Sequence, residues 1–187
     1  MFQFTQHRDL TGLHAPFSPS QSSWLRYSDE KLLEVYANKQ AADRGSRLHA
    51  WAKETIDLKI KQPRSNKTLS TYVNDAIGFE METEVVLFYS PRFFGTADAI
   101  SFRNNCLRIH DLKTGKVKAD MEQLMVYAAL FCLEYKVRPE TLEDIELRIY
   151  QNDEVLVAKP TNEEITQIMK IIIRFDKILE KKMSEEV

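Results

Sequence analysis

The spacing of apolar residues changes near residue 80 and separates two kinds of predicted element. Before that point, Leu48, Ala52 and Ile56 recur every four residues, which is the spacing of one helix face. A helix is therefore predicted over about 39–60. Shorter helices are predicted around Trp24, from a cap at Ser28, and over 68–77.

After residue 80, apolar residues alternate with polar ones or form short runs between turn residues, which is typical of β-strands. The pattern predicts strands over 84–89, 93–103, 106–113, 145–151 and 155–159, and helices over 118–135 and 163–181. This order predicts an α/β (α+β) fold, with a mixed sheet of about five strands flanked by helices. No linker interrupts the pattern, so residues 1–187 are expected to form a single domain.

The turn at Asn104-Asn105 predicts which residues of two neighbouring strands lie opposite each other. Asparagine tolerates a positive φ, so a two-residue hairpin turn is expected there. Counting back from that turn places Asp98 opposite Asp111. Strand alternation puts one set of side chains on a single face: Asp98, Ile100, Phe102, Leu107, Ile109, Asp111 and Lys113.

Two carboxylates and one ammonium group at the end of an apolar face point to a metal site. Opposed β-carbons lie about 4.5–5.5 Å apart, so Asp98 and Asp111 would repel each other without a cation between them. Mg²⁺ is commonly held by one or two carboxylates together with water and phosphate oxygens. The alternative is an internal ion pair in which Lys113 neutralises one aspartate. Two acids with one lysine favour the metal site.

Three motifs follow one another around these residues: Gly95-Thr96-Ala97-Asp98, His110-Asp111-Leu112-Lys113-Thr114-Gly115 and Gln123-Leu124-Met125-Val126-Tyr127. Together they resemble the PD-(D/E)XK nuclease superfamily, specifically its RecB-like, phage-type exonuclease branch. Upstream, Gly45-Ser46-Arg47-Leu48-His49 is similar to that family's Gly-x-x-x-His helix motif, and Ser18-Pro19-Ser20-Gln21 to its N-terminal opening. The resemblance implies a restriction-endonuclease-like core.

The same resemblance implies roles for individual residues. His49, Asp98, Asp111 and the Leu112 carbonyl would bind Mg²⁺ or Mn²⁺, and Lys113 would be catalytic. Gln123 and Tyr127 would line the active site beside the scissile phosphate. His110 is expected on the opposite strand face, in a structural role.

Glu84 is a further candidate ligand, and it depends on one hairpin. If Ser90-Pro91-Arg92 is a three-residue loop, Glu84 faces Asp98, although Glu82 competes for that position. Iron–sulfur members of the family use one early and three late cysteines. This chain has only Cys106 and Cys132, so no iron–sulfur cluster is expected.

The charge balance bears on the partner of this predicted site. A net charge of −2 argues against a basic protein that coats nucleic acid, but it leaves room for a local basic groove. The expected partner is DNA, single- or double-stranded, with a free end. Five cations near the motifs are candidates for phosphate contacts: Arg44, Arg47, Lys53, Lys116 and Lys118.

The sequence therefore predicts a metal-dependent DNA exonuclease of phage or bacterial recombination or repair, with a homo-oligomer or a recombination protein as a further partner. The alternative from another class is a non-catalytic DNA-binding or interaction module that keeps the nuclease fold. A sequence-specific restriction endonuclease ranks lower, because no recognition insertion is evident. Apolar runs are short and no signal peptide is evident, so no membrane association and a cytoplasmic location are expected.

Overall fold

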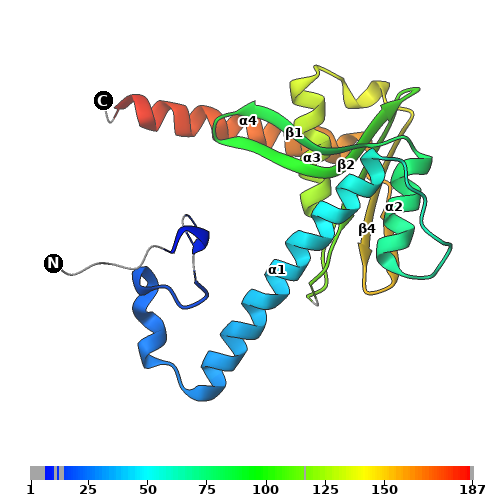
Figure 1. Ribbon diagram of the computed structural model, residues 1–187. Helices are drawn as coiled ribbons and strands as arrows, with labels where there is room; N and C mark the ends of the chain where they lie inside the picture. Colours follow the sequence, from blue (N-terminus) through cyan, green and yellow to red (C-terminus); the bar gives the residue numbers. More distant parts are fainter. Residues whose placement is uncertain (1–6, 11, 13–14, 116, 186–187) are drawn as a thin grey trace. The chain divides into compact units, whose positions relative to one another are not determined.

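The computed structural model describes residues 7–10, 12, 15–115 and 117–185 (Figure 1). Its contacts form two compact units, residues 1–44 and residues 45–187. The first unit contains the 3₁₀ helices η1 (Arg8–Leu10) and η2 (Pro19–Arg26) and the first part of helix α1 (Asp29–Asp57). The second contains the rest of α1, the whole sheet and the remaining helices.

Helix α1 is one continuous element of 29 residues, although the sequence predicts two helices in this region. The Ser28 hydroxyl caps its start, as expected, by accepting a hydrogen bond from the Lys31 N–H at 3.3 Å. No proline interrupts the segment between, so the helix continues through it. The predicted helix around Trp24 is present as the 3₁₀ helix η2.

The second unit is built on a mixed five-stranded sheet in the order β1-β2-β3-β4-β5, which confirms the predicted fold class. Its strands are β1 (Glu82–Ser90), β2 (Phe93–Arg103), β3 (Cys106–Leu112), β4 (Asp144–Gln151) and β5 (Glu154–Ala158). Strands β3 and β4 pair in parallel, whereas the other neighbours pair antiparallel. The helices are α2 (Thr68–Gly78), α3 (Glu122–Glu134), the 3₁₀ helix η3 (Pro139–Thr141) and α4 (Asn162–Glu185).

Helices cover both faces of this sheet and enclose two apolar cores (Figure 1). Under α3 and α4, Ile100, Leu107 and Ile109 are buried, so the apolar part of the predicted strand face is confirmed. On the other face, Ala52 and Ile56 of α1 and several residues of α2 pack on β2, β3 and β4. The sheet thus lies between two helical layers.

The hairpin between β2 and β3 has the predicted turn. Asn104 and Asn105 have φ angles of 49° and 57°, the left-handed values that a two-residue primed turn requires. The backbone pairs then run in the predicted register from Arg103–Cys106 to Ala99–His110. They end one step before Asp98 and Asp111.

The hairpin between β1 and β2 differs from its prediction. Ser90 pairs with Phe93, so its loop has two residues and not three. A bulge between Phe88 and Ser90 shifts the register by one residue. Glu84 consequently still lies opposite Asp98, between the pairs Thr83–Ala99 and Val85–Ala97.

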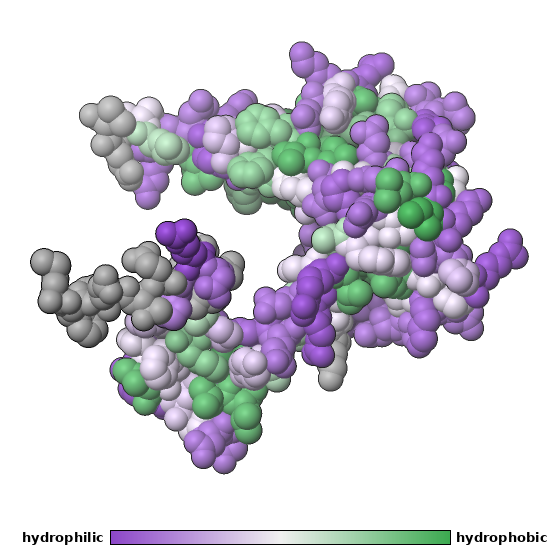
Figure 2. Space-filling model, viewed as in Figure 1, coloured by the Kyte–Doolittle hydropathy of each residue, from purple (hydrophilic) through white to green (hydrophobic). Residues whose placement is uncertain are grey.

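The tip of this hairpin is fixed to α4 by a buried carboxylate. The Asp176 carboxylate accepts hydrogen bonds from the Ser90 hydroxyl at 2.6 Å and the Arg92 guanidinium at 2.8 Å. Figure 2 shows apolar side chains where α4 and the hairpin lie. Phe94 of β2 and Ile178 of α4 are exposed large apolar residues. Within the described residues, no helix combines the length and apolar character needed to cross a bilayer.

Candidate active site

The face alternation of β1 and β2 breaks at Glu84 and Asp98. Ala97 is buried under α3 and α4, whereas Ala99, two residues later, is buried under α1 and α2. On the neighbouring strand, Glu84 has a φ of 53°, a left-handed value that is unusual within a strand. Asp98 therefore does not share the face of Ile100, which corrects the predicted single face.

This break brings three possible metal ligands together. One ligand atom each of His49, Glu84 and Asp98 lie within 4.8 Å of one another. The His49 imidazole Nδ1 is 3.4 Å from Asp98 Oδ2, and the Leu112 N–H donates a hydrogen bond to the same oxygen at 3.0 Å. Carboxylate oxygens suit Mg²⁺, and a site of two carboxylates and one imidazole also suits Mn²⁺.

The electrostatic environment of Asp98 also favours a cation. Burial, and after it the nearby charges of Asp111 and Glu84, raise the pKa of the Asp98 carboxyl to about 6. The Leu112 N–H and His49 act in the opposite direction. A bound cation would favour the ionised carboxylate at this position.

Asp111 and Lys113 form the neighbouring half of the site. The Lys113 ammonium lies 3.1 Å from the Asp111 carboxylate and donates a hydrogen bond to Gln123 Oε1 at 2.8 Å. Gln123 Nε2 in turn donates to the Tyr127 hydroxyl at 3.2 Å. The four side chains predicted from the motifs are thus connected in one chain of contacts from β3 to α3.

One oxygen of Asp111 has no hydrogen-bonding partner. Its Oδ2 is buried, and no hydrogen bond to it is found among the described residues. The Lys113 ammonium lies 3.1 Å from this oxygen, so Lys113 is its positively charged partner. Within the described residues, the donor set of His49, Glu84 and Asp98 fits a divalent cation, whereas Asp111, a predicted ligand, is not a member of this group. The predicted Leu112 carbonyl ligand stays a prediction.

Two motif glycines allow close approaches around the site. A β-carbon at Gly45 would lie 2.6 Å from Thr114 Oγ1, and one at Gly95 would lie 2.8 Å from the Tyr127 ring. Any other residue would push these partners away. The absence of a side chain thus lets α1 pass close to the end of β3, and lets Tyr127 rest on β2.

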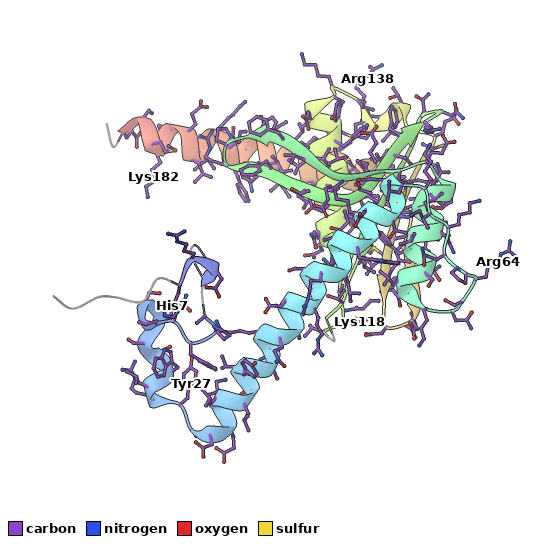
Figure 3. All side chains as sticks on the ribbon, viewed as in Figure 1. His7, Tyr27, Arg64, Lys118, Arg138 and Lys182 are labelled. Carbon is purple, nitrogen blue, oxygen red and sulfur yellow. The ribbon has the colours of Figure 1, made fainter. Side chains whose placement is uncertain are left out.

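The five cations predicted to contact phosphate lie in different environments. Lys53 is engaged by Asp57 and Thr83, so it clamps α1 to β1. Arg47 is exposed on α1, and Lys118 is exposed between β3 and α3 (Figure 3). Arg44 belongs to the first unit, and Lys116 lies outside the described residues.

Tyr72 of α2 is a site neighbour that sequence reasoning missed. It is 3% exposed and packs against the Tyr150 ring at 5.3 Å. Burial raises the pKa of its hydroxyl, and the charges of Asp98, Asp111 and Glu84 raise it further, which places Tyr72 near all three acids. Its sequence context is an ordinary amphipathic helix and carries no motif.

A second group of charges, all half-buried, lies on the α2 side of β3 and β4, and we call it the arginine cluster. It consists of Asp75, Arg108, Glu146 and Arg148. Both guanidinium groups also lie over the Phe79 ring, at 4.8 and 5.0 Å from its centroid. His110 lies beside this cluster in the predicted structural position: its Nδ1 is 3.2 Å from the Tyr150 hydroxyl, and burial and the two arginines lower its pKa to about 3.

Comparison with known protein families assigns the chain to one family. Residues 66–174 match the family model described as "Protein of unknown function (DUF2800)", and the chain belongs to that family. The matched region contains Glu84, Asp98, Asp111, Lys113, Gln123 and Tyr127, and it begins after His49. Neither the curated proteins nor the solved structures contain a match.

Proposed function

We propose that this protein is a Mg²⁺- or Mn²⁺-dependent DNA exonuclease with a PD-(D/E)XK-type site. The observation that supports this most is the grouping of His49, Glu84 and Asp98 beside the contact between Asp111 and Lys113. These residues come from α1, β1, β2 and β3, so folding brings them together from distant positions. Acids that converge with a lysine suit phosphodiester hydrolysis better than they suit a purely structural role.

The acids and His49 would hold the metal. When bound, a divalent cation polarises a phosphate oxygen, lowers the pKa of a bound water and stabilises the leaving oxygen. Asp98 is held for this role by its hydrogen bond from the Leu112 N–H. Glu84 reaches the cluster because its left-handed backbone turns the side chain out of the regular strand alternation.

Lys113 would stabilise the negative charge that develops on the phosphate in the transition state. Gln123 accepts a hydrogen bond from its ammonium group, and Tyr127 holds Gln123 in turn. This chain of contacts limits the rotamers of Lys113 and keeps its charge beside Asp111. Gln123 and Tyr127 therefore act first as positioning residues for Lys113 and, with it, line the position of the scissile phosphate.

The proposed substrate is DNA with a free end, in a phage or bacterial recombination or repair process. A cytoplasmic location, a single nuclease domain over residues 1–187, and a homo-oligomer or recombination partner belong to the same proposal. The sequence-specific endonuclease remains the less favoured enzyme, because two-residue turns join β1 to β2, β2 to β3 and β4 to β5, and the β3–β4 connection consists mainly of α3 and η3.

A non-catalytic DNA-binding module is the second candidate. It is favoured only by the ion pair between Lys113 and Asp111, which could serve the fold alone. Against it, a purely structural pair does not require Glu84 in a left-handed conformation. A catalytic role for Glu84 accounts for this feature.

Digestion of end-labelled linear DNA and covalently closed circular DNA tests the proposal. With Mg²⁺ or Mn²⁺, linear DNA should be degraded and closed circles spared, and EDTA should stop the reaction. Glu84→Gln should abolish activity, whereas Glu82→Gln, its exposed neighbour, should retain it. Intact linear DNA under all metal conditions would contradict the enzyme, and rapid cutting of circles would favour an endonuclease.

A further inference from the structure

The loop between α1 and α2 has an unusual charge composition. Residues 58–67 read Leu-Lys-Ile-Lys-Gln-Pro-Arg-Ser-Asn-Lys, with four cations and no acid, in a chain whose net charge is −2. Figure 3 shows Arg64 extending from this loop into solvent. A concentration of positive charge in an otherwise acidic protein indicates an anionic partner.

Hydrogen bonds hold this loop in a defined conformation. The Gln62 N–H donates to Asn74 Oδ1 at 2.8 Å, and Asn74 Nδ2 donates to the Gln62 carbonyl at 3.0 Å. At the end of the loop, Asp153 of the β4–β5 turn accepts hydrogen bonds from Lys67 at 2.7 Å and from the Thr68 N–H at 3.1 Å. The loop is therefore attached to α2 in its middle and to the sheet at its end.

The loop and α2 enclose an open polar groove of about 550 Å³. Its lining residues are Lys61, Gln62, Arg64, Ser65, Asn66, Thr71, Asn74 and Asp75. The single acid among them, Asp75, forms an ion pair with Arg148 at 2.9 Å and accepts a hydrogen bond from the Tyr150 hydroxyl at 2.7 Å. Lys61 and Arg64 have no ion pair with any described residue, so the groove carries uncompensated positive charge.

We propose that this groove is a second DNA-binding site, in which Lys61 and Arg64 contact backbone phosphates of the strand that is bound at the acidic residues. The inference rests on the proposed function. Along α1, the eight helical rises between His49 and Asp57 cover about 12 Å before the loop begins, a length of about three to four base pairs of DNA. Short fragments would therefore leave the groove empty.

A phosphate polymer fits the groove better than a single small anion does. The cations and amides are spread along an open loop, and no buried charged group converges on one point within the described lining. Backbone contacts of this kind fix the position of DNA without reading its sequence. The groove would thus hold DNA while the strand end lies at the catalytic residues.

Binding measurements on the full chain test this site separately from catalysis. Fluorescence anisotropy with a labelled 30-base-pair duplex in EDTA should show about tenfold weaker binding for Lys61→Ala/Arg64→Ala. The slope of log K against log salt concentration should fall by nearly 2, because two phosphate contacts are lost. The matched control is Lys136→Ala/Arg138→Ala, which removes two exposed cations after α3 and should change neither value (Figure 3).

Two results separate this inference from the proposed function. If the protein hydrolyses no DNA, yet binds it through Lys61 and Arg64, the groove is supported and the nuclease is not. If it hydrolyses DNA but the double variant binds with unchanged affinity and salt slope, the groove is overturned and the nuclease stands. Hydrolysis of bis-p-nitrophenyl phosphate, which is too small to reach the groove, should be equal in the variant and the wild type.

Discussion

The arginine cluster and the acidic residues of the candidate site both lie at the sheet, but their charges are balanced differently. In the arginine cluster, Arg108 and Arg148 are matched by Asp75 and Glu146, and the stacked Phe79 ring adds further stabilisation. At the candidate site, three carboxylates face one lysine and one histidine. The charges of the first arrangement balance within the protein, whereas the second has an excess of negative charge.

That difference separates a structural role from a binding role. Removing one partner from a paired, buried group leaves an uncompensated charge, so the fold loses stability. Removing an acid from an already repulsive group relieves repulsion, so the fold gains stability and the ligand site is lost. Mutations in the two regions should therefore have opposite effects on stability and on activity.

The largest expected effect comes from Lys113→Ala. If Lys113 stabilises the transition state, kcat should fall by roughly 10²–10³, equivalent to about 3–4 kcal/mol, while KM changes little. Single-turnover cleavage and thermal melting on the same sample measure the two roles. Lys159→Ala, which breaks an exposed pair with Asp144, is the control and should keep full activity. A folded, DNA-binding and fully active Lys113→Ala protein would exclude Lys113 from the mechanism.

The next largest effect is expected in the arginine cluster. Arg148→Met should lower the free energy of unfolding by about 2–3 kcal/mol, because Asp75 and Glu146 lose their partner in a mostly buried position. Hydrolysis of bis-p-nitrophenyl phosphate, which does not involve the groove, should not change per folded molecule. Denaturant unfolding measures this, with Arg103→Met as the control. Arg103 forms an exposed pair with Glu80, so its loss should cost less than about 1 kcal/mol.

An effect of the opposite sign is expected for Asp98→Asn. The Asp98 carboxyl has a pKa of about 6 in the fold, against 3.8 as its ordinary value, so the folded state disfavours its ionised form. The resulting destabilisation of the wild type is absent below pH 4, grows between pH 4 and 6, and is complete above pH 6.

In metal-free buffer at pH 8, Asp98→Asn should therefore be more stable than the wild type by about 1–2 kcal/mol. At pH 4 the two proteins should melt alike. Added Mn²⁺ should stabilise the wild type and not the variant, and wild-type metal binding should weaken as the pH falls below 6. Equal stability of both proteins at pH 8 would show that Asp98 carries no net repulsion.

The smallest stability change is expected at Gly45. A β-carbon there meets only Thr114 Oγ1, and the better helix propensity of alanine offsets part of the clash. Gly45→Ala should thus change stability by less than about 1 kcal/mol, yet it should lower activity by moving α1 and His49 away from β3. Gly78→Ala, which meets nothing within 4 Å, is the control. Full activity in Gly45→Ala would show that the close approach of α1 to Thr114 is not needed to position His49.

Local rules were sufficient to predict much of the second unit. The positive φ angles of Asn104 and Asn105 follow from residue type, and the register of β2 and β3 follows from that turn. The mixed sheet and its flanking helices follow from the change in apolar spacing. These features depend on short stretches of chain, so the sequence pattern was enough to predict them.

The details of the site depend on longer-range packing and were predicted less well. The break in alternation at Asp98 arises because β2 packs under different helices on either side of that residue, which no strand pattern reveals. The prediction placed Glu84 opposite Asp98 by assuming a three-residue loop. The loop has two residues, and a bulge in β1 restores the same pairing. Tyr72 was missed because its proximity to the acids depends on the placement of α2 against the sheet.

The left-handed conformation of Glu84 has a consequence for selection during evolution. A glutamate at a φ of 53° strains the backbone by roughly 1–2 kcal/mol, and glycine would relieve that strain. A library screened only for thermal stability should therefore enrich Glu84→Gly together with Asp98→Asn. A library screened for DNA degradation should retain both acids. The positions at which the two screens disagree would map the residues that natural selection keeps against the preference of the fold.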